Sequence, residues 1–252
     1  MTVRVGRVPY LNHEPFYFDM ERRGIQLCDL LPNALAAAAE KGEIDAGPVP
    51  LVDSFGLEEG FSPVAGFCLA VTNKAGSSSL YSKQPIEELA GASIGIGGED
   101  STSAHLLRVL LTLKYRIQPG AFVAVDDSPA AILLSGDQAL RRRRGVRGYP
   151  HQYDLGEEWH EWTGLPFVFS RWLVRNDTDT EDVALLEDTL YVGLEDGVDS
   201  LYHLSEPRNN LLMLAKDIME YVQGIRYFIG LSEQKAIDLF REYLGQAGVA
   251  IR

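Results

Sequence analysis

The sequence predicts an α/β protein built from two lobes. An apolar-alternating strand begins at Arg4, and a clearly apolar strand spans residues 64–71. The same order of elements restarts in mid-chain, with a strand at 92–96, a polar turn at 97–103 and an amphipathic helix at 104–114. Alternating strands and helices are typical of a mainly parallel sheet. The restart indicates that a second α/β unit follows the first.

Helix boundaries follow from the residues that start and stop helices. We expect a short helix at 14–23, closed by Gly24, and a second at 32–41, with a proline near its start and Gly42 after its end. From Thr180 onward the pattern is mainly helical. The helix candidates in that part are 185–194, 215–221 and 232–244.

We expect the chain to pass between the lobes twice, near residues 72–92 and near residues 172–180. The first lobe is then discontinuous, formed by 1–85 and 175–252, and the second lobe is formed by 86–174. This layout is that of the type II periplasmic-binding-protein fold, in which a ligand cleft lies between the lobes. The layout predicts where a ligand binds but does not identify the ligand.

The composition excludes several classes of partner. Of the 252 residues, 46% are apolar, which is typical of a globular protein with an ordinary core. The 23 basic and 36 acidic side chains give a net charge of −13. Nucleic acids and anionic membrane surfaces are therefore poor partners. A small anionic ligand is compatible with this charge, because a few N–H donors can bind an anion locally.

The expected location is the cytoplasm. The chain opens on a polar-alternating strand rather than on the basic and apolar segments of a signal peptide, and no window approaches the roughly 20 apolar residues of a membrane span. Cys28 and Cys68 lie in apolar surroundings, so we expect free thiols. The five histidines show no metal-ligand spacing, and Gly95 and Gly97 lack the rest of a nucleotide-binding motif. We expect neither a metal nor a cofactor.

The turn after the first strand carries Tyr10, Asn12 and His13. Ligands of open α/β sheets bind at the carboxyl ends of strands. The Asn12 amide can donate to a carboxylate and accept from a hydroxyl at once, which suits a hydroxy acid. Alternatively, it satisfies the backbone of its own turn. His13 is either a general base or a solvated residue at the start of a helix.

A second polar cluster, Asp100-Ser101-Thr102-Ser103, immediately precedes the amphipathic helix. These residues can cap the helix, and its free N–H groups can face an anion. Gly95, Gly97 and Gly98 lie just ahead and would allow a ligand to approach the backbone closely. The cluster is therefore either a cap or one wall of a ligand site.

The sequence allows two roles for each of two further residues. Ser77 lies in a tract of three serines at the first crossover, where it either donates a hydroxyl into the cleft or belongs to a flexible linker. Asp137 follows a buried run and Gly136. It lies at another strand end or caps the following helix.

Several segments occur in the order found in one enzyme family. They include Tyr10-Leu11-Asn12 at the first strand end, the tract that contains Ser77, Ser101-Thr102-Ser103, residues 135–140 and residues 221–227. Together with the segments between them, they cover nearly the whole chain. The sequence resembles the chorismate dehydratases of the futalosine route to menaquinone.

This resemblance implies that the partner is chorismate, converted to 3-[(1-carboxyvinyl)oxy]benzoate with loss of water. It implies that Asn12 is catalytic and that Asp137 lines or supports the pocket. Removing the ring proton next to the enolpyruvyl ether leaves charge that spreads into the ring carboxylate, where donors stabilise it. No histidine or carboxylate stands out as the base, and the substrate's own carboxylate is an alternative. The expected substrate-binding residues are Tyr10, Ser77, Ser101, Thr102, Ser103 and Asp137.

Two other functions stay open. A non-catalytic cytoplasmic protein on the same fold would bind a small carboxylate tightly and form no product. A lyase or hydrolase that acts on a nucleoside would need a base-stacking pocket, and it would bind futalosine-like compounds. Hydrolysis by a serine nucleophile has no support, because no Ser-His-Asp order with a nucleophile elbow occurs in the chain.

Overall fold

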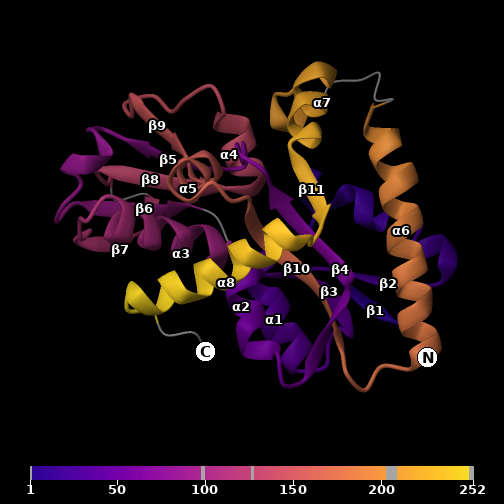
Figure 1. The fold of residues 1–252 in the computed structure, drawn as a ribbon. Coiled ribbons are helices and arrows are strands. Elements are labelled where there is room, and N and C mark those ends of the chain that lie inside the picture. Colours follow the sequence, from indigo (N-terminus) through magenta and orange to yellow (C-terminus); the bar gives the residue numbers. More distant parts are fainter. Residues whose placement is uncertain (1, 98–99, 126–127, 203–208, 250–252) are drawn as a thin grey trace.

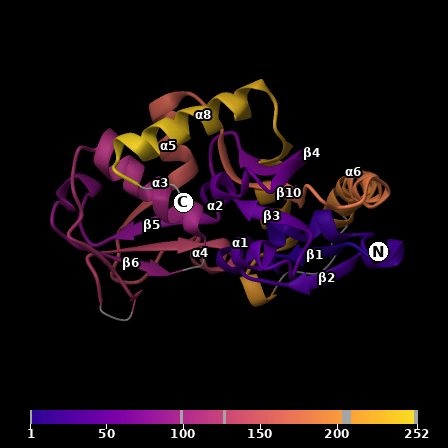
Figure 2. The ribbon, with the colours of Figure 1, turned by 90° about the horizontal axis from the view of Figure 1, so that it is seen from below.

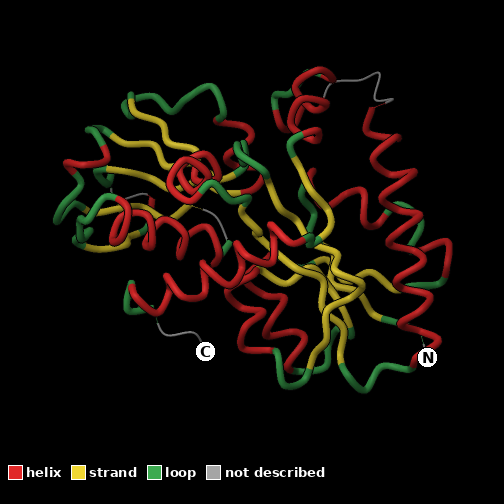
Figure 3. Tube along the Cα trace, viewed as in Figure 1, coloured by secondary structure: helices red, strands yellow, loops and turns green. Residues whose placement is uncertain are grey.

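The structure is a computed structural model that describes residues 2–97, 100–125, 128–202 and 209–249. Two β-sheets, each with its own helices, confirm the predicted α/β class and the two-lobed layout (Figure 1). Figure 3 shows the strands gathered into two groups, with helices around both.

The first sheet contains six strands, in the spatial order β11 (Ile225–Phe228), β4 (Phe61–Val71), β10 (Phe167–Arg175), β3 (Ala46–Pro50), β1 (Arg4–Arg7) and β2 (Gln26–Asp29). β1 pairs in parallel with β2 and β3, whereas β10 runs antiparallel to β3 and β4. β3 is buried along its whole length, as expected for a central strand covered on both faces.

The second sheet contains five strands, in the order β7 (Ala121–Val123), β6 (Ser93–Gly97), β8 (Ala131–Ser135), β5 (Ser78–Ser82) and β9 (His151–Asp154). β6 is parallel to β7 and β8, and β5 is antiparallel to β8 and β9. The carboxyl ends of β6 and β8 therefore lie at the same edge of this sheet.

The α-helices are α1 (Pro32–Glu40), α2 (Leu51–Ser54), α3 (Ser101–Val109), α4 (Gly136–Arg142), α5 (Leu155–Thr163), α6 (Thr180–Tyr202), α7 (Ala215–Gln223) and α8 (Leu231–Gln246). Shorter helical turns are η1 (Leu11–Tyr17), η2 (Glu21–Arg23), η3 (Phe55–Leu57), η4 (Ile86–Glu88), η5 (Leu110–Lys114) and η7 (Asn209–Leu211). The helices predicted at 32–41, 215–221 and 232–244 are confirmed to within a few residues. The one predicted at 185–194 is the middle of the longer α6.

The helix predicted at 14–23 is wrong as a single element. The chain forms two 3-10 helices there, η1 and η2, and Gly24 ends the second in a left-handed conformation. Pro15 lies inside η1 and has no N–H to donate to a preceding turn, so a continuous α-helix would lose a hydrogen bond at that point.

The sheets divide the chain at positions that differ from the predicted lobe boundaries. The chain leaves the first sheet after β4 and enters the second at β5, which lies before residue 86. It returns at β10, which begins at Phe167, ahead of the predicted crossover at 172–180. β5 thus pairs within the second sheet and β10 within the first. A buried apolar strand has the same sequence pattern in either sheet, so periodicity does not reveal which sheet it joins.

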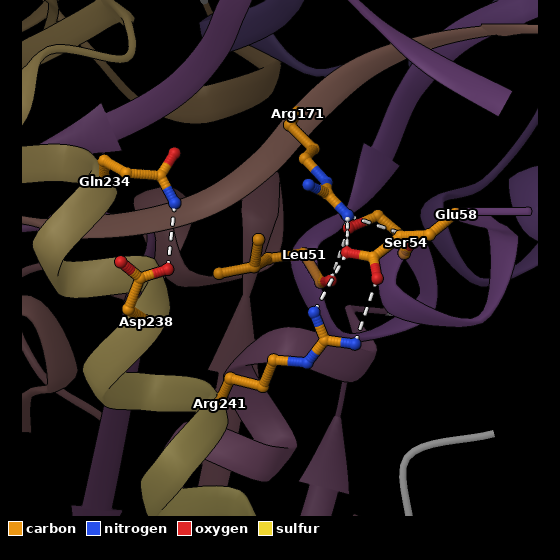
Figure 4. A network of polar contacts seen from close by, with 7 residues as sticks. All are labelled: Leu51, Ser54, Glu58, Arg171, Gln234, Asp238 and Arg241. Atoms are coloured by element: carbon orange, nitrogen blue, oxygen red, sulfur yellow. Dashed lines mark hydrogen bonds and ion pairs between the residues drawn. The ribbon is translucent and has the colours of Figure 1, made fainter.

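Helix α8 contacts both lobes (Figure 2). The Phe240 ring lies 5.8 Å from the ring of Trp159 on α5 and 5.0 Å from that of Phe167 on β10. The next residue, Arg241, forms an ion pair with Glu58, which also pairs with Arg171 of β10 (Figure 4). The largest apolar cluster is continuous from one lobe to the other, and α8 packs along it.

Two further expectations concern the cysteines and the possibility of a membrane-spanning helix. Cys28 and Cys68 are both free, as predicted. Among the helices that the structure describes, none combines the length and the apolar character needed to cross a membrane.

Candidate functional site

A pocket lies between the two sheets, where parallel strands from both lobes end. The first lobe contributes residues at and after the ends of β1 and β3, and the second contributes residues that follow β6 and β8. The cavity volume is about 40 Å³ in this structure, well below the roughly 300–1,000 Å³ of a site that holds a small molecule, so a ligand of that size enters only if the lobes move apart. Its lining residues are Val8, Tyr10, Asn12, His13, Pro32, Pro48, Pro50, Leu69, Ser77, Asp100, Gly136, Phe169 and Ser170.

Asn12 and His13, on η1, form a polar part of the pocket wall. Each side chain is buried, and the Nδ1 atom of His13 lies 2.7 Å from the Oδ1 atom of Asn12. Because an amide oxygen can only accept a hydrogen bond, the ring proton is on Nδ1, and Nε2 keeps its lone pair. Burial lowers the pKa of His13 to about 3. The ring is therefore neutral at physiological pH and is a weak base.

Tyr221, on α7, joins this group. Burial raises the pKa of its hydroxyl, which therefore stays protonated, while the Ser77 and Asn12 side chains partly offset this rise. The three side chains connect η1, the first crossover and the C-terminal part of the chain. Sequence reasoning did not select Tyr221, because a tyrosine in an amphipathic helix has the pattern of a core residue.

Asp154 holds the crossover segment on which Ser77 lies. Its Oδ2 atom accepts the N–H of Gly76 at 2.7 Å, and its Oδ1 atom accepts the N–H of Ala75 at 2.8 Å. Oδ1 also accepts the N–H of Gly156 at 3.0 Å and so caps α5. One buried carboxylate thereby fixes the crossover to the second lobe.

Gly136 allows the ring of Tyr10 to lie against the start of α4. Its φ of +59° is in the left-handed region, and a Cβ atom there would lie 2.6 Å from Cε2 of Tyr10. Next to it, the N–H of Leu11 donates to Oδ1 of Asp137 at 3.3 Å. Asp137 thus supports the turn that carries Tyr10, and it is not among the lining residues.

Asp100 both caps α3 and lines the pocket. Its Oδ1 atom accepts the N–H of Thr102 at 3.0 Å, and its Oδ2 atom accepts the hydroxyl of Ser103. Burial raises the pKa of Asp100 to about 6, in spite of these donors. The N-terminus of α3 already holds a carboxylate of the protein itself. Sequence analysis gave the cluster that contains Asp100 two interpretations, a cap or one wall of a ligand site, and did not select Asp100 as a site residue.

The hydroxyls of the neighbouring cluster bind protein groups. Ser101 donates to Oδ2 of Asp53 at 2.7 Å, and Oγ1 of Thr102 accepts the N–H of Val52 at 3.3 Å. Ser103 accepts a further hydrogen bond from a serine of β5. None of the three hydroxyl residues is among those that line the pocket.

The predicted site residues fall into two groups. The structure brings Tyr10, Asn12 and Ser77 to the pocket wall. It places Ser101, Thr102, Ser103 and Asp137 behind the wall, as partners of residues that form it. Gly98 lies outside the described residues.

Ser170, on β10, is a pocket residue that sequence reasoning missed. Its side-chain oxygen is buried and has no hydrogen-bond partner among the residues that the structure describes. A buried hydroxyl without a partner is costly, and a ligand in the pocket can supply one. The only sequence signal was its position in an apolar strand, which does not distinguish it from a core serine.

The charges of the pocket are few. Among the described lining residues, Asp100 carries the one carboxyl group, and no lysine or arginine is present. In the part of the chain that the structure covers, no three His, Cys, Asp or Glu side chains gather as metal ligands would. The chemistry available in the wall is that of an amide, hydroxyls, a neutral imidazole and one carboxylate.

Comparison with known families decides where the chain belongs. The model of a family described as menaquinone biosynthesis matches residues 3–246. The chain belongs to this family. A relative, the chorismate dehydratase of Thermus thermophilus, is 23% identical over 261 residues, which cover 96% of this chain and 94% of that enzyme.

Solved structures support the fold of this family member. A protein of Archaeoglobus fulgidus matches with a TM-score of 0.74 at 14% identity, over 98% of each chain. The alkanesulfonate-binding protein SsuA from Xanthomonas axonopodis pv. citri matches with 0.67 at 14% identity, over 98% of this chain and 93% of that one. A Candida albicans protein with the generic periplasmic binding protein fold matches with 0.60 at 13% identity, over 100% and 92%. The predicted periplasmic-binding-protein-like fold is confirmed.

Proposed function

We propose that this member of the menaquinone biosynthesis family dehydrates chorismate to 3-[(1-carboxyvinyl)oxy]benzoate. The observation that carries the proposal is the match to a chorismate dehydratase over almost the full length of both chains. The pocket between the lobes supports it, because its polar residues follow the strand ends at which ligands of such folds bind.

The pocket wall carries the kinds of group that a ring with carboxylates and a hydroxyl would contact. Val8, Leu69 and Phe169 provide apolar surface, while Asn12 and Ser77 provide hydrogen-bond donors. When the ring proton next to the enolpyruvyl ether leaves, negative charge spreads through the diene into the ring carboxylate. Donors that are held at that carboxylate bind the transition state more strongly than the substrate. Loss of the neighbouring hydroxyl then yields an aromatic ring.

Asn12 is the residue to which this reaction assigns the main binding role. The His13 ring holds the oxygen of its amide, so the amide does not reorient when charge develops. A donor fixed in place before the reaction stabilises the transition state without a reorganisation cost.

A binding protein without catalysis is the second candidate, and the similarity to the alkanesulfonate-binding protein favours it. Such a protein closes on a small anion and releases it unchanged. It differs from the enzyme in one observable, because it forms at most a complex and never a product.

The test is to incubate the purified protein with chorismate and to separate the products by chromatography with mass detection. Chorismate decays by itself, so a sample without protein and one with Asn12→Ala serve as controls. A species lighter than chorismate by one water, formed only with the wild-type protein, supports the dehydratase. Binding of chorismate with no such species supports the second candidate.

A further inference from the structure

A groove on the second lobe shares no lining residue with the pocket between the lobes. It lies against β8, the last residues of α4 and the segment that follows α4. Its cavity volume is about 790 Å³, within the range of sites that hold a small molecule. The groove is therefore large enough for a ligand in the structure as it stands.

The groove has an apolar floor. Ile132 and Leu134 on β8 line it, and they belong to a small apolar cluster on one face of the second sheet. Leu133, between them, packs in the largest apolar cluster on the other face, as alternation along a strand requires. Val146 and Tyr149 pack beside the floor and also line the groove. An apolar ring or chain has surface to lie against here.

Arginines surround this floor. Five arginines and no acidic residue lie between Asp137 and Asp154 in the sequence. Arg141, Arg142 and Arg147 are exposed and line the groove. These three form no ion pair with any described residue, and no described lining residue carries a carboxyl group. On a chain with a net charge of −13, such a group of uncompensated cations attracts small anions locally.

The other two arginines show that helix and packing requirements do not explain the whole group. Arg143 forms an ion pair with Asp217 at 2.6 Å and donates to the carbonyl of Leu212 at 2.7 Å, so protein groups satisfy it. Arg144 is exposed and does not line the groove. Cations are favoured at the carboxyl end of a helix, but Arg147 lies beyond the end of α4.

Hydrogen bonds fix the wall of the groove. The Tyr81 hydroxyl donates to the carbonyl of Arg142 at 3.0 Å, and the Tyr149 hydroxyl donates to the carbonyl of Pro129 at 3.1 Å. The ammonium group of Lys83 lies 5.3 Å from the centre of the Tyr149 ring, which adds a further positive charge close by. A wall that is already ordered lowers the entropic cost of binding.

We propose that this groove is a second binding site, for a small organic anion with an apolar ring or chain. The apolar part lies on Ile132 and Leu134. The carboxylate, sulfonate or phosphate groups pair with Arg141, Arg142 and Arg147, because a guanidinium group binds such oxyanions through two parallel hydrogen bonds. The inference does not depend on the proposed dehydration.

The test uses 1-naphthyl phosphate, an aromatic anion whose fluorescence reports binding, with the purified full-length protein at low ionic strength. Inorganic phosphate and 1-naphthol test the anionic and the apolar part separately. We expect one molecule of 1-naphthyl phosphate per chain, bound at least about tenfold more tightly than 1-naphthol, since charged hydrogen bonds add to the apolar contact. Inorganic phosphate should compete only weakly, because it leaves the floor empty.

Three variants locate the site. Arg142→Gln and Arg147→Gln should each weaken binding of 1-naphthyl phosphate by about fivefold or more, the effect of losing a charged hydrogen bond. Arg144→Gln is the matched control, because it removes the same charge from the same run of arginines at a position outside the groove. It should keep the affinity within about twofold of the wild type, since an exposed charge outside the site contributes little.

Three results would overturn the proposal. Equal weakening by Arg144→Gln and Arg142→Gln would mean that the general positive charge, and not the groove, attracts the probe. Wild-type affinity in both Arg142→Gln and Arg147→Gln would mean that the probe binds elsewhere, for example in the pocket between the lobes. Absence of saturable binding of 1-naphthyl phosphate, or an affinity no better than that of 1-naphthol, would show that the arginines do not form an anion site.

Discussion

The Nδ1 atom of His13 lies 2.7 Å from the Oδ1 atom of Asn12, and both side chains are buried in the wall of the pocket between the lobes. The contact fixes the orientation of the Asn12 amide on η1. The amide of Asn12 is thus a preorganised hydrogen-bond donor, and His13 is the residue that holds it in place.

Replacing Asn12 tests this donor. For Asn12→Ala, we expect kcat/KM for chorismate to fall 100-fold to 1000-fold, which corresponds to about 3 to 4 kcal/mol of lost transition-state stabilisation. Asn33→Ala is the matched control, because Asn33 is exposed on α1 and is not among the pocket residues. Equal steady-state kinetics for the two variants would contradict the assignment of Asn12.

The unpartnered hydroxyl of Ser170 gives a second prediction. For Ser170→Ala, we expect the free energy of unfolding to be unchanged or slightly higher, because a buried hydroxyl without a partner is removed. The affinity for 3-[(1-carboxyvinyl)oxy]benzoate should fall about fivefold to tenfold, the effect of one lost hydrogen bond of about 1 kcal/mol. Denaturation and calorimetric titration measure the two quantities, and equal ligand affinity would rule out a contact with the Ser170 hydroxyl.

His13 makes stability depend on pH. Its pKa is about 3 in the folded protein and 6.5 for an ordinary histidine, so between these values the unfolded chain binds a proton that the folded protein does not. The free energy of unfolding therefore falls as the pH drops below 6.5, by at most about 1.4 kcal/mol per pH unit, and is unaffected above it.

Urea denaturation at pH 7.5 and pH 5 measures this effect. His13→Gln should show a smaller loss of stability between these pH values than the wild type, whereas His151→Gln, on β9, should show the wild-type loss. The comparison between variants removes the contribution of Asp100, whose raised pKa acts in the opposite direction. The same loss in all three proteins would show that His13 is not held in its neutral form.

The close approach of Gly136 to Tyr10 predicts a loss of activity for Gly136→Ala. A Cβ atom at this position would lie 2.6 Å from the Tyr10 ring, which must then move in the pocket wall. Gly164 has a similar positive φ of +70° and open space around it. Both alanine variants should lose about 1 kcal/mol of stability, but only Gly136→Ala should lose more than tenfold in kcat/KM. Unchanged activity for Gly136→Ala would contradict a role for the Tyr10 position.

Asp154 predicts a large stability effect at the crossover. Asp154→Ala removes the acceptor of the Ala75 and Gly76 N–H groups and the cap of α5, and we expect a loss of about 3 kcal/mol. Asp179→Ala removes an exposed cap, since Asp179 accepts the N–H of Glu181 at 2.9 Å, and should cost about 1 kcal/mol. Chemical denaturation compares the free energies of unfolding of the two variants. Equal losses would show that the hydrogen bonds to Ala75 and Gly76 add nothing to stability.

The parts of the fold that sequence predicted are those with a local cause. The strand at 64–71 and the helix at 104–114 follow from hydrophobic periodicity, and the cap at Asp100 follows from the residues beside it. The first two residues of β5, Ser78 and Ser79, belong to the serine tract that was expected at the first crossover, and only pairing with β8 and β9 makes them part of a strand. Such pairing depends on partners that are distant in the sequence.

The same difference between local and distant causes applies to the site residues. Asn12 and Ser77 were selected from strand ends and from a family resemblance, and they line the pocket. Ser170, which lines the pocket, and Tyr221, which lies near Asn12 and Ser77, were missed, since the tertiary fold alone brings them there. Asp154 was not selected, because its bonds to residues nearly 80 positions earlier are invisible to local patterns.

The most direct test of the central claim is to count product molecules for each protein molecule during incubation with chorismate, by proton NMR of the appearing aromatic signals. The proposed dehydratase forms many molecules of 3-[(1-carboxyvinyl)oxy]benzoate per protein molecule, and Asn12→Ala forms far fewer over the same time. Aromatic product at the rate of the protein-free sample, with chorismate bound, would contradict catalysis and leave a binding protein of the same fold.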